Sequence, residues 1–291
     1  MADVFAASLT PFSSPTGGVG HSWNPQHLRR LEAQGADGVV PCGTTGEGPS
    51  LGLAERMAVI DTVLAHRGRL RVIAGTGCAS LPETIAATRY ALERGAEAAL
   101  VIPPYYFKNL DDAGLLIFYR ALCDALPADG KIMLYHIPPV SQIPIPTGVI
   151  DGLMESHAAQ VMGLKDSGGD SEHTAMLIRR YPQMKIYTGG TPVFARALAD
   201  GAAGGIFALA NAFPAALKAV AAAHSAGSDP APAQAHVAAL NDLLKNYGAI
   251  PALKALLPHL AGLPHSSPRA PLLPLADGGA AVWQVVKPLL G

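Results

Sequence analysis

Short apolar runs alternate with longer segments of helical periodicity along most of this chain. Strands that are separated by helices pair in parallel through right-handed crossovers, because each helix carries the chain back across the sheet. Eight such units predict an α/β fold, and the simplest way to join them is a closed (β/α)8 TIM barrel. The expected strands are residues 4–9, 38–41, 71–75, 98–102, 132–137, 161–165, 185–188 and 205–209.

The segments between these runs carry apolar residues three and four positions apart, which is typical of amphipathic helices. We expect helices at residues 25–34, 53–65, 81–94, 111–126, 147–155, 171–180, 192–199 and 214–224. An open doubly wound sheet is the structural alternative. That fold needs a glycine-rich nucleotide loop after its first strand, where this chain has Thr10, Pro11 and Phe12 instead.

A change in composition follows the eighth unit. Residues 227–232 are rich in glycine and proline, which indicates a linker. Helical patterns then resume at residues 233–247, 251–256 and 280–289. We therefore expect two parts, a catalytic barrel over residues 1–226 and a C-terminal helical region over residues 227–291.

Composition and charge exclude several classes of partner. The 291 residues have a formal net charge of −1 and no basic stretch stands out, so we expect no nucleic-acid partner. The sequence offers neither a signal peptide nor an uninterrupted apolar stretch of membrane-spanning length, so we expect no membrane partner. Cys42, Cys78 and Cys123 are an odd, widely spaced set, which fits reduced thiols in the cytoplasm and argues against structural zinc.

Lys165 closes the sixth expected strand and precedes a Ser-Gly-Gly segment. Burial lowers the pKa of an ammonium group, and a neutral amine is a nucleophile that condenses with carbonyl compounds. The glycines leave room for a small ligand beside it. We therefore expect Lys165 to form a Schiff base with a 2-oxo acid, the alternative being a strand-end lysine that points into solvent.

Other polar residues fall at the carboxyl ends of the expected strands, where TIM barrels place their reactive groups. Thr44 and Thr45 lie between glycines after the second strand and could hold a carboxylate through hydroxyl and backbone N–H groups. Tyr106 belongs to an adjacent pair of tyrosines after the fourth strand, and Tyr135 lies at the end of the fifth. A phenol at this rim could move protons, whereas packing is the simpler alternative for each tyrosine.

Small residues dominate the ends of the last two expected strands, and glycines at this place in a barrel can also bind phosphate, so a phosphorylated substrate stays open. The sequence shows no metal cluster, because His136, His157 and His173 do not fall at ligand spacing on a shared strand end. We interpret His136 as no more than a contact for the substrate. Cys42 has no obvious base beside it, so we expect no nucleophilic role for its thiol.

Three motifs together resemble the dihydrodipicolinate synthase and N-acetylneuraminate lyase family. They are Gly-Thr-Thr-Gly-Glu at residues 43–47, Tyr-His-Ile-Pro at 135–138 and Gly-Leu-Lys-Asp at 163–166. The resemblance extends over nearly the whole chain. It implies a (β/α)8 barrel with a C-terminal helical region, assembled as a homotetramer or homodimer. It also implies a lyase with class I aldolase chemistry on pyruvate and an aldehyde, with no cofactor and no metal.

The resemblance also implies roles for individual residues. Lys165 matches the Schiff-base lysine, and Tyr135 matches the tyrosine that moves protons at the reacting oxygen. Thr44 and Thr45 match the loop that holds the carboxylate of the 2-oxo acid, and Thr44 also matches a member of the proton relay. Tyr106 matches a tyrosine that reaches into the neighbouring subunit's site in many members.

Gly189 and Ile206 match positions that line the pocket near the lysine. Departures from the family pattern bear on the substrate. Val140 stands where dihydrodipicolinate synthases usually have an arginine for the aldehyde's carboxylate, and valine cannot make that contact. Residues 190–193 lack the acidic side chains that sialic acid lyases usually have after the seventh strand.

These departures favour a 2-keto-3-deoxy sugar acid, or a related 2-oxo acid, as the substrate of a C–C bond-forming or bond-cleaving aldolase. Three alternatives stay open. The first is 4-hydroxy-tetrahydrodipicolinate (dihydrodipicolinate) synthase activity, in which pyruvate condenses with aspartate semialdehyde. The second is a 2-oxo acid dehydratase of the same family. The third is a barrel that binds a ligand without catalysis.

Overall fold

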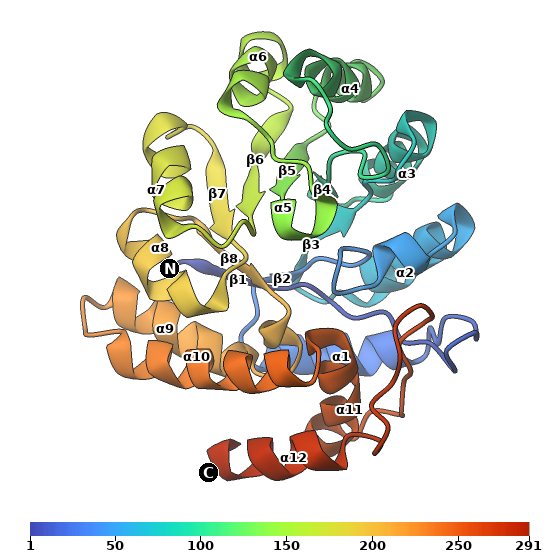
Figure 1. Ribbon diagram of the computed structural model, residues 1–291, viewed down its shortest axis with the longest axis vertical. Coiled ribbons are helices and arrows are strands. Elements are labelled where there is room, and N and C mark those ends of the chain that lie inside the picture. The colour runs from blue at the N-terminus through green and yellow to red at the C-terminus, as the bar shows by residue number, and fades with distance from the viewer. Residues whose placement is uncertain (291) are drawn as a thin grey trace.

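The computed structural model describes residues 1–290 and confirms the closed eight-stranded barrel (Figure 1). All neighbouring strands pair in parallel, and β8 closes the barrel onto β1. The strands are β1 Asp3–Ala6, β2 Gly38–Val39, β3 Arg71–Gly75, β4 Ala98–Val101, β5 Ile132–His136, β6 Val161–Asp166, β7 Lys185–Thr188 and β8 Gly204–Phe207.

Helices follow the strands in turn and surround the barrel (Figure 1). They are α1 Trp23–Ala33, α2 Leu53–His66, α3 Leu81–Glu93, α4 Asp112–Asp124, α5 Pro138–Ser141, α6 Thr147–His157, α7 Ser171–Arg180, α8 Phe194–Ala199 and α9 Pro214–Ser225. Ser80 caps α3 by accepting a hydrogen bond from the backbone N–H of Glu83. The side chain of Asp170 does the same for the first turn of α7.

Several expected boundaries differ from those in the structure. The runs 4–9, 38–41 and 205–209 were expected as strands over their full length, but β1, β2 and β8 end two or three residues earlier. Leu9 and Val40 beyond β1 and β2 are buried in loops, and Leu209 beyond β8 begins a buried 3-10 turn, so hydropathy cannot separate these residues from a strand. The helix expected at 192–199 is a 3-10 turn, Thr191–Val193, followed by α8. The four-residue helix α5 was not expected.

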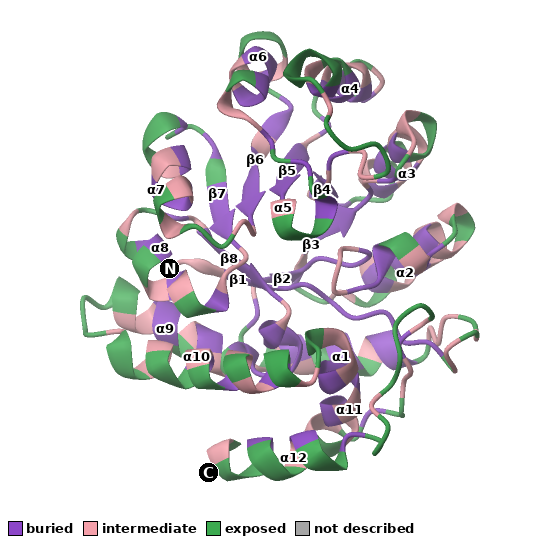
Figure 2. Ribbon diagram, viewed as in Figure 1, coloured by how far each residue is buried: buried purple, intermediate pink, exposed green. Residues whose placement is uncertain are grey.

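Two apolar layers hold the barrel together. The inner layer fills the barrel with side chains that include Phe5, Ile73, Met133, Tyr187 and Ile206. The outer layer lies between the strands and the helices, and Figure 2 shows the helices around the barrel with buried residues on one side and exposed residues on the other. Because successive side chains of a strand point to opposite faces, each strand contributes alternately to the two layers.

The C-terminal region consists of α10 Ala231–Asn246, α11 Ala249–Ala261, α12 Ala280–Val286 and a 3-10 turn, Lys287–Leu290. Figure 1 shows α10 beside α9, with α11 and α12 continuing outward from there. Val237, Leu253 and Val282 belong to the same buried apolar cluster as Val4 and Val72 of the barrel. The division into residues 1–226 and 227–291 stays a prediction. Among the described helices none is long and apolar enough to span a bilayer.

Candidate active site

Lys165 lies on β6 with its side chain almost fully buried at 5% exposure. The strand register pairs it with Tyr135 of β5 on one side and with Tyr187 of β7 on the other. Its amine donates a hydrogen bond to the Tyr135 hydroxyl across 3.3 Å, and Nζ lies 4.4 Å from the centre of the Tyr135 ring. The expected solvent-facing alternative for this lysine is therefore wrong.

Thr44 connects to the same phenol from the loop after β2. Its Oγ1 lies 3.3 Å from Tyr135 Oη, within hydrogen-bond distance. Thr44, Tyr135 and Lys165, called here the triad, thus form a continuous chain of polar groups that come from three separate strand ends. Thr44 and Tyr135 also line a small pocket, together with Tyr105, Ile102 and other residues from the ends of β2, β3 and β4.

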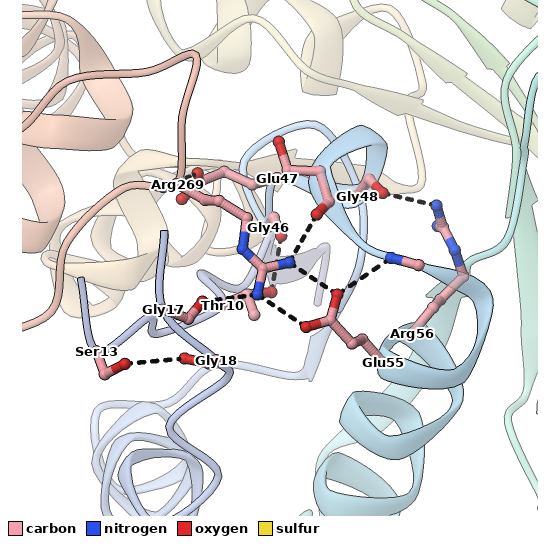
Figure 3. Close-up of polar contacts among 12 residues, drawn as sticks. Thr10, Ser13, Gly17, Gly18, Gly46, Glu47, Gly48, Glu55, Arg56 and Arg269 are labelled. Carbon is pink, nitrogen blue, oxygen red and sulfur yellow. Dashed lines mark hydrogen bonds and ion pairs between the residues drawn. The ribbon is translucent and has the colours of Figure 1, made fainter. Parts of the chain in front are cut away.

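The loop that carries Thr44 and Thr45, residues 43–47, is called here the Gly-Thr-Thr loop. It is held by hydrogen bonds on its backbone, one of them from Thr10 Oγ1 to the carbonyl of Gly46 at 2.7 Å (Figure 3). Arg56 of α2 donates to the carbonyls at the loop's two edges, Cys42 and Gly48, at 3.2 and 2.7 Å. Cys42 has a left-handed backbone with φ +60°, a conformation that ordinary residues adopt only when their surroundings enforce it.

Arg56 was not singled out from the sequence, although its position contained a signal. It is buried and shares the buried stripe of α2 with Val59, Ile60 and Val63. A guanidinium group on an otherwise apolar stripe needs internal partners, because an unpaired buried donor costs free energy. Arg56 finds them in carbonyl groups, including that of Gly75 at 2.8 Å.

Tyr106 lies apart from the triad. Its side chain is 74% exposed and packs edge to face against Phe107, with ring centres 5.3 Å apart. Tyr105 is the member of the pair that faces the pocket, and burial raises the pKa of its hydroxyl. Lys108 donates hydrogen bonds to the carbonyls of Tyr105 and Ser141, which connects this segment to α5.

Gly189 and Ile206, the two expected pocket-lining residues, are not among the residues that line the pocket of Thr44 and Tyr135. The backbone N–H of Gly189 donates to the carbonyl of Asp166 at 2.6 Å, directly after Lys165. A Cβ atom at Gly189 would lie 2.0 Å from Ser167 Oγ, so a larger residue here requires the Ser167 side chain to move. Ile206 of β8 is buried in the inner layer that also contains Tyr135 and Tyr187.

His136 and Asp166 directly follow Tyr135 and Lys165, so their side chains point to the opposite, outer face of the sheet. There His173 of α7 stacks on His136, with ring centres 4.6 Å apart, and its Nδ1 lies 2.9 Å from Asp166 Oδ2. Thr174 donates to the same carboxylate oxygen at 2.8 Å. Spacing along the sequence did not predict this grouping, and His136 lies in it instead of contacting the triad.

The ligand atoms of His136, Asp166 and His173 lie within 4.8 Å of one another, a separation that a metal ion could bridge. However, His136 Nδ1 accepts the backbone N–H of Ile145 at 3.1 Å, so a neutral ring carries its proton on Nε2. Coordination through Nε2 would require the other tautomer and would break that hydrogen bond. The bonds present favour a hydrogen-bonded cluster over a cation site.

The surroundings of His136, Asp166 and His173 shift the pKa values of these groups in different directions. The hydrogen bond to Asp166 raises the pKa of His173, and burial lowers the pKa of His136. Burial alone would raise the pKa of Asp166, but hydrogen bonds from His173, the Gly168 N–H and Thr174 together lower it. Elsewhere, burial raises the pKa of the Cys42 thiol to about 12, and a protonated thiol is a poor nucleophile.

Comparisons with known proteins agree with this geometry. The sequence model of a protein family, described as the Dihydrodipicolinate synthetase family, matches residues 1–285 of this chain. An uncharacterized DapA-like lyase of Chloroflexus aurantiacus is 52% identical over 94% of this chain and 92% of its own length. A 4-hydroxy-tetrahydrodipicolinate synthase of Prochlorococcus marinus is 37% identical over 94% and 90%. The crystal structure named KD(P)GA from T. tenax is 27% identical, with a TM-score of 0.89 over 100% and 99% of the two chains.

Proposed function

The chain belongs to the dihydrodipicolinate synthetase family and is a lyase of the aldolase type, and on that premise we propose that it forms or cleaves a C–C bond on a pyruvate skeleton through a Schiff base on Lys165. One observation carries the proposal. The buried amine of Lys165 lies within 3.3 Å of the Tyr135 hydroxyl, which lies within 3.3 Å of the Thr44 hydroxyl.

This chain of groups suits each step of the reaction. Lys165 Nζ attacks the C2 ketone and water leaves, which gives a protonated imine that accepts the electron pair of the breaking C3–C4 bond. Tyr135 takes the proton from the C4 hydroxyl as that bond breaks, and the aldehyde departs. The enamine that remains gains a proton at C3, and water then releases pyruvate from Lys165. In the synthetic direction the same groups act in the reverse order.

The Gly-Thr-Thr loop is the proposed site for the carboxylate of the 2-oxo acid. Thr44 and Thr45 provide hydroxyl donors, and both residues are partly accessible. We assign Gly189 and Ile206 to the border of the space near Lys165, because Gly189 bonds to the Asp166 carbonyl and Ile206 packs in the same inner layer as Tyr135. No cofactor or metal is needed for this chemistry, because the protonated imine itself is the electron sink.

For the second substrate we propose a hydroxylated aldehyde, so that the cleaved compound is a 2-keto-3-deoxy sugar acid or a related 2-oxo acid. Val140 of α5 supports this, because its side chain is 57% exposed and carries no charge for a second carboxylate. Lys108, which could have replaced the missing arginine, is engaged with the Tyr105 and Ser141 carbonyls.

Synthesis of 4-hydroxy-tetrahydrodipicolinate from pyruvate and aspartate semialdehyde is the second candidate. The 37% identical protein of Prochlorococcus marinus carries that name, and this similarity favours the candidate. Dehydration of a 2-oxo acid is a third outcome of the same imine: loss of a C3 proton gives an enamine, which expels the C4 hydroxyl as water while the C3–C4 bond stays intact.

We also propose that Tyr106 completes the site of a second subunit in a homotetramer or homodimer. Its exposed ring, together with that of Phe107, supports a contact outside this chain. A location in the cytoplasm stays a prediction, in keeping with three buried, free cysteines.

Borohydride reduction in the presence of pyruvate tests the proposal. We expect one pyruvate-sized adduct on Lys165 by peptide mass spectrometry, and none in Lys165→Ala. Lys185→Ala is the matched control, because Lys185 lies on the next strand with an exposed side chain and should leave the adduct intact. Wild-type protein without an adduct would refute the Schiff base. Release of pyruvate from a series of 2-keto-3-deoxy acids, run beside condensation with aspartate semialdehyde, distinguishes the substrates.

A further inference from the structure

We propose that Glu47 and Lys254 are positioning residues, through which the C-terminal helical region holds the Gly-Thr-Thr loop in its carboxylate-binding geometry. This inference rests on the proposed function, because it assigns the loop to the carboxylate of the 2-oxo acid. Under this inference, Lys254, which lies outside the barrel strands, supports substrate binding by fixing the loop.

The contact between the two residues is a buried ion pair. Lys254 Nζ of α11 lies 2.5 Å from Glu47 Oε1, and both side chains are 1% exposed. Lys254 also donates to the carbonyl of Ser267 at 2.8 Å and lies over the ring of Phe12, 4.6 Å from its centre. The ammonium group is therefore fixed from several sides, and it fixes the Glu47 carboxylate in turn.

Arg269 holds the other oxygen of the same carboxylate. Its backbone N–H donates to Glu47 Oε2 at 2.8 Å, and its guanidinium group forms a two-pronged contact with Glu55 at 2.7 and 2.8 Å. Figure 3 shows the Arg269 side chain reaching across to Gly17 and Glu55, with Glu47 beside it and Arg56 of α2 pointing to Gly48. Residues from the C-terminal region thus engage both oxygens of Glu47.

The backbone of Glu47 explains why such anchoring is needed. Glu47 has φ +53°, a left-handed conformation that costs a residue with a side chain free energy and persists only when contacts enforce it. It lies two residues after Thr45 and three after Thr44, which contacts Tyr135. A change in the Glu47 backbone would move both threonines relative to Lys165.

Stability alone is a weak reason for this ion pair. Burial of two charges costs about as much free energy as their attraction returns, so such pairs contribute little net stability even though loss of one partner is costly. The geometry points instead to a role in placing the loop. This distinction can be measured, because removal of both charges should restore stability without restoring the loop position.

The test compares Lys254→Met, Glu47→Gln and the double variant Lys254→Met/Glu47→Gln. The measured quantities are the thermal midpoint and the rate of borohydride trapping on Lys165 over a range of pyruvate concentrations. We expect each variant to raise the half-saturating pyruvate concentration by about tenfold, the equivalent of one lost interaction. The limiting trapping rate should stay near that of wild type, because Lys165 and Tyr135 are untouched.

The double variant and a control separate positioning from stability. We expect the double variant to melt higher than Lys254→Met, since no charge is left unpaired, yet to keep the raised half-saturating concentration. Lys218→Met breaks an ion pair of 2.9 Å with Asp37, away from the loop, and should leave pyruvate affinity unchanged. Recovery of affinity together with stability in the double variant would overturn the inference. A wild-type protein that traps no pyruvate would instead overturn the proposed function.

Discussion

The hydroxyl of Tyr135 lies 3.3 Å from the amine of Lys165, at the same level of two adjacent strands. Because the register of β5 and β6 places the two residues opposite each other, a general acid–base group and a nucleophile share one end of the barrel interior. Thr44 extends the arrangement by one hydroxyl, and the four predictions below test this geometry and the contacts that surround it.

Tyr135→Phe should preserve the Schiff base and slow the reaction. The ring and its contact with Lys165 Nζ stay, but the hydroxyl that moves the proton is lost. We expect normal borohydride trapping and a turnover number reduced by about 10²–10⁴, the usual contribution of a positioned acid or base. Peptide mass spectrometry and pyruvate release measure the two quantities. Wild-type turnover in this variant would exclude Tyr135 from the relay.

Thr44→Val removes one hydroxyl without a change of shape. Its hydrogen bond to Tyr135 contributes about 1 kcal/mol, so we expect kcat to fall by about threefold to tenfold. Thr45→Val is the matched variant, and should raise the KM for the 2-oxo acid more than it lowers kcat. Steady-state kinetics of both variants provide the comparison. Equal effects of both on kcat would contradict a distinct role for Thr44.

Gly75→Ala should displace the Gly-Thr-Thr loop from the side of β3. A Cβ atom at this position would lie 2.6 Å from the carbonyl of Cys42 and 2.7 Å from the backbone nitrogen of Gly43. The backbone has to move, so we expect unfolding free energy to fall by about 1–3 kcal/mol and pyruvate binding to weaken.

Gly114→Ala is the control for this change. Gly114 lies within α4 with open space around its Cα, so alanine there should raise the unfolding free energy by about 0.5–1 kcal/mol. Urea denaturation measures both variants. A Gly75→Ala protein as stable as wild type would show that the loop tolerates displacement.

The pair of His173 and Asp166 should make stability depend on pH. The hydrogen bond to Asp166 raises the pKa of His173, so its contribution is complete below about pH 6.5 and is lost as pH rises through the folded value. The pKa of Asp166 is lowered overall, so its contribution is present above about pH 4 and is lost as pH falls through the folded value.

The stability advantage of wild type over His173→Leu should therefore be greatest between about pH 4 and pH 6.5 and smaller near pH 9. Urea denaturation of both proteins across this range gives the difference directly. An advantage that stayed constant from pH 5.5 to pH 9 would contradict a charged contact between His173 and Asp166.

The barrel could be predicted from the sequence because each of its eight units repeats the same change of hydrophobic period. The ends of β1 and β2 could not, because Leu9 and Val40 are buried in loops where apolar residues look the same as in strands. The helix α5 was missed because four residues beginning with two prolines contain too little periodicity to indicate a helix.

Some residues of the site could also be predicted from the sequence, and others could not. Lys165, Tyr135 and Thr44 were accessible to prediction because each lies at or beyond the carboxyl end of its own strand, and a parallel barrel brings these strand ends to one rim. Arg56 and Lys254 were not, because they lie on helices and their partners are loop groups whose positions depend on the completed fold. For the adjacent tyrosines, the sequence could not show which ring faces the pocket.

The contacts of Glu47 with Lys254 and Arg269 also bear on the order of events during synthesis. A ribosome makes the chain from its N-terminus, and the residues that fix Glu47 are more than two hundred positions behind it. All eight strands can leave the ribosome before the substrate loop has its last supports. The nascent barrel therefore cannot acquire its final loop geometry until Lys254 and Arg269 have also been made.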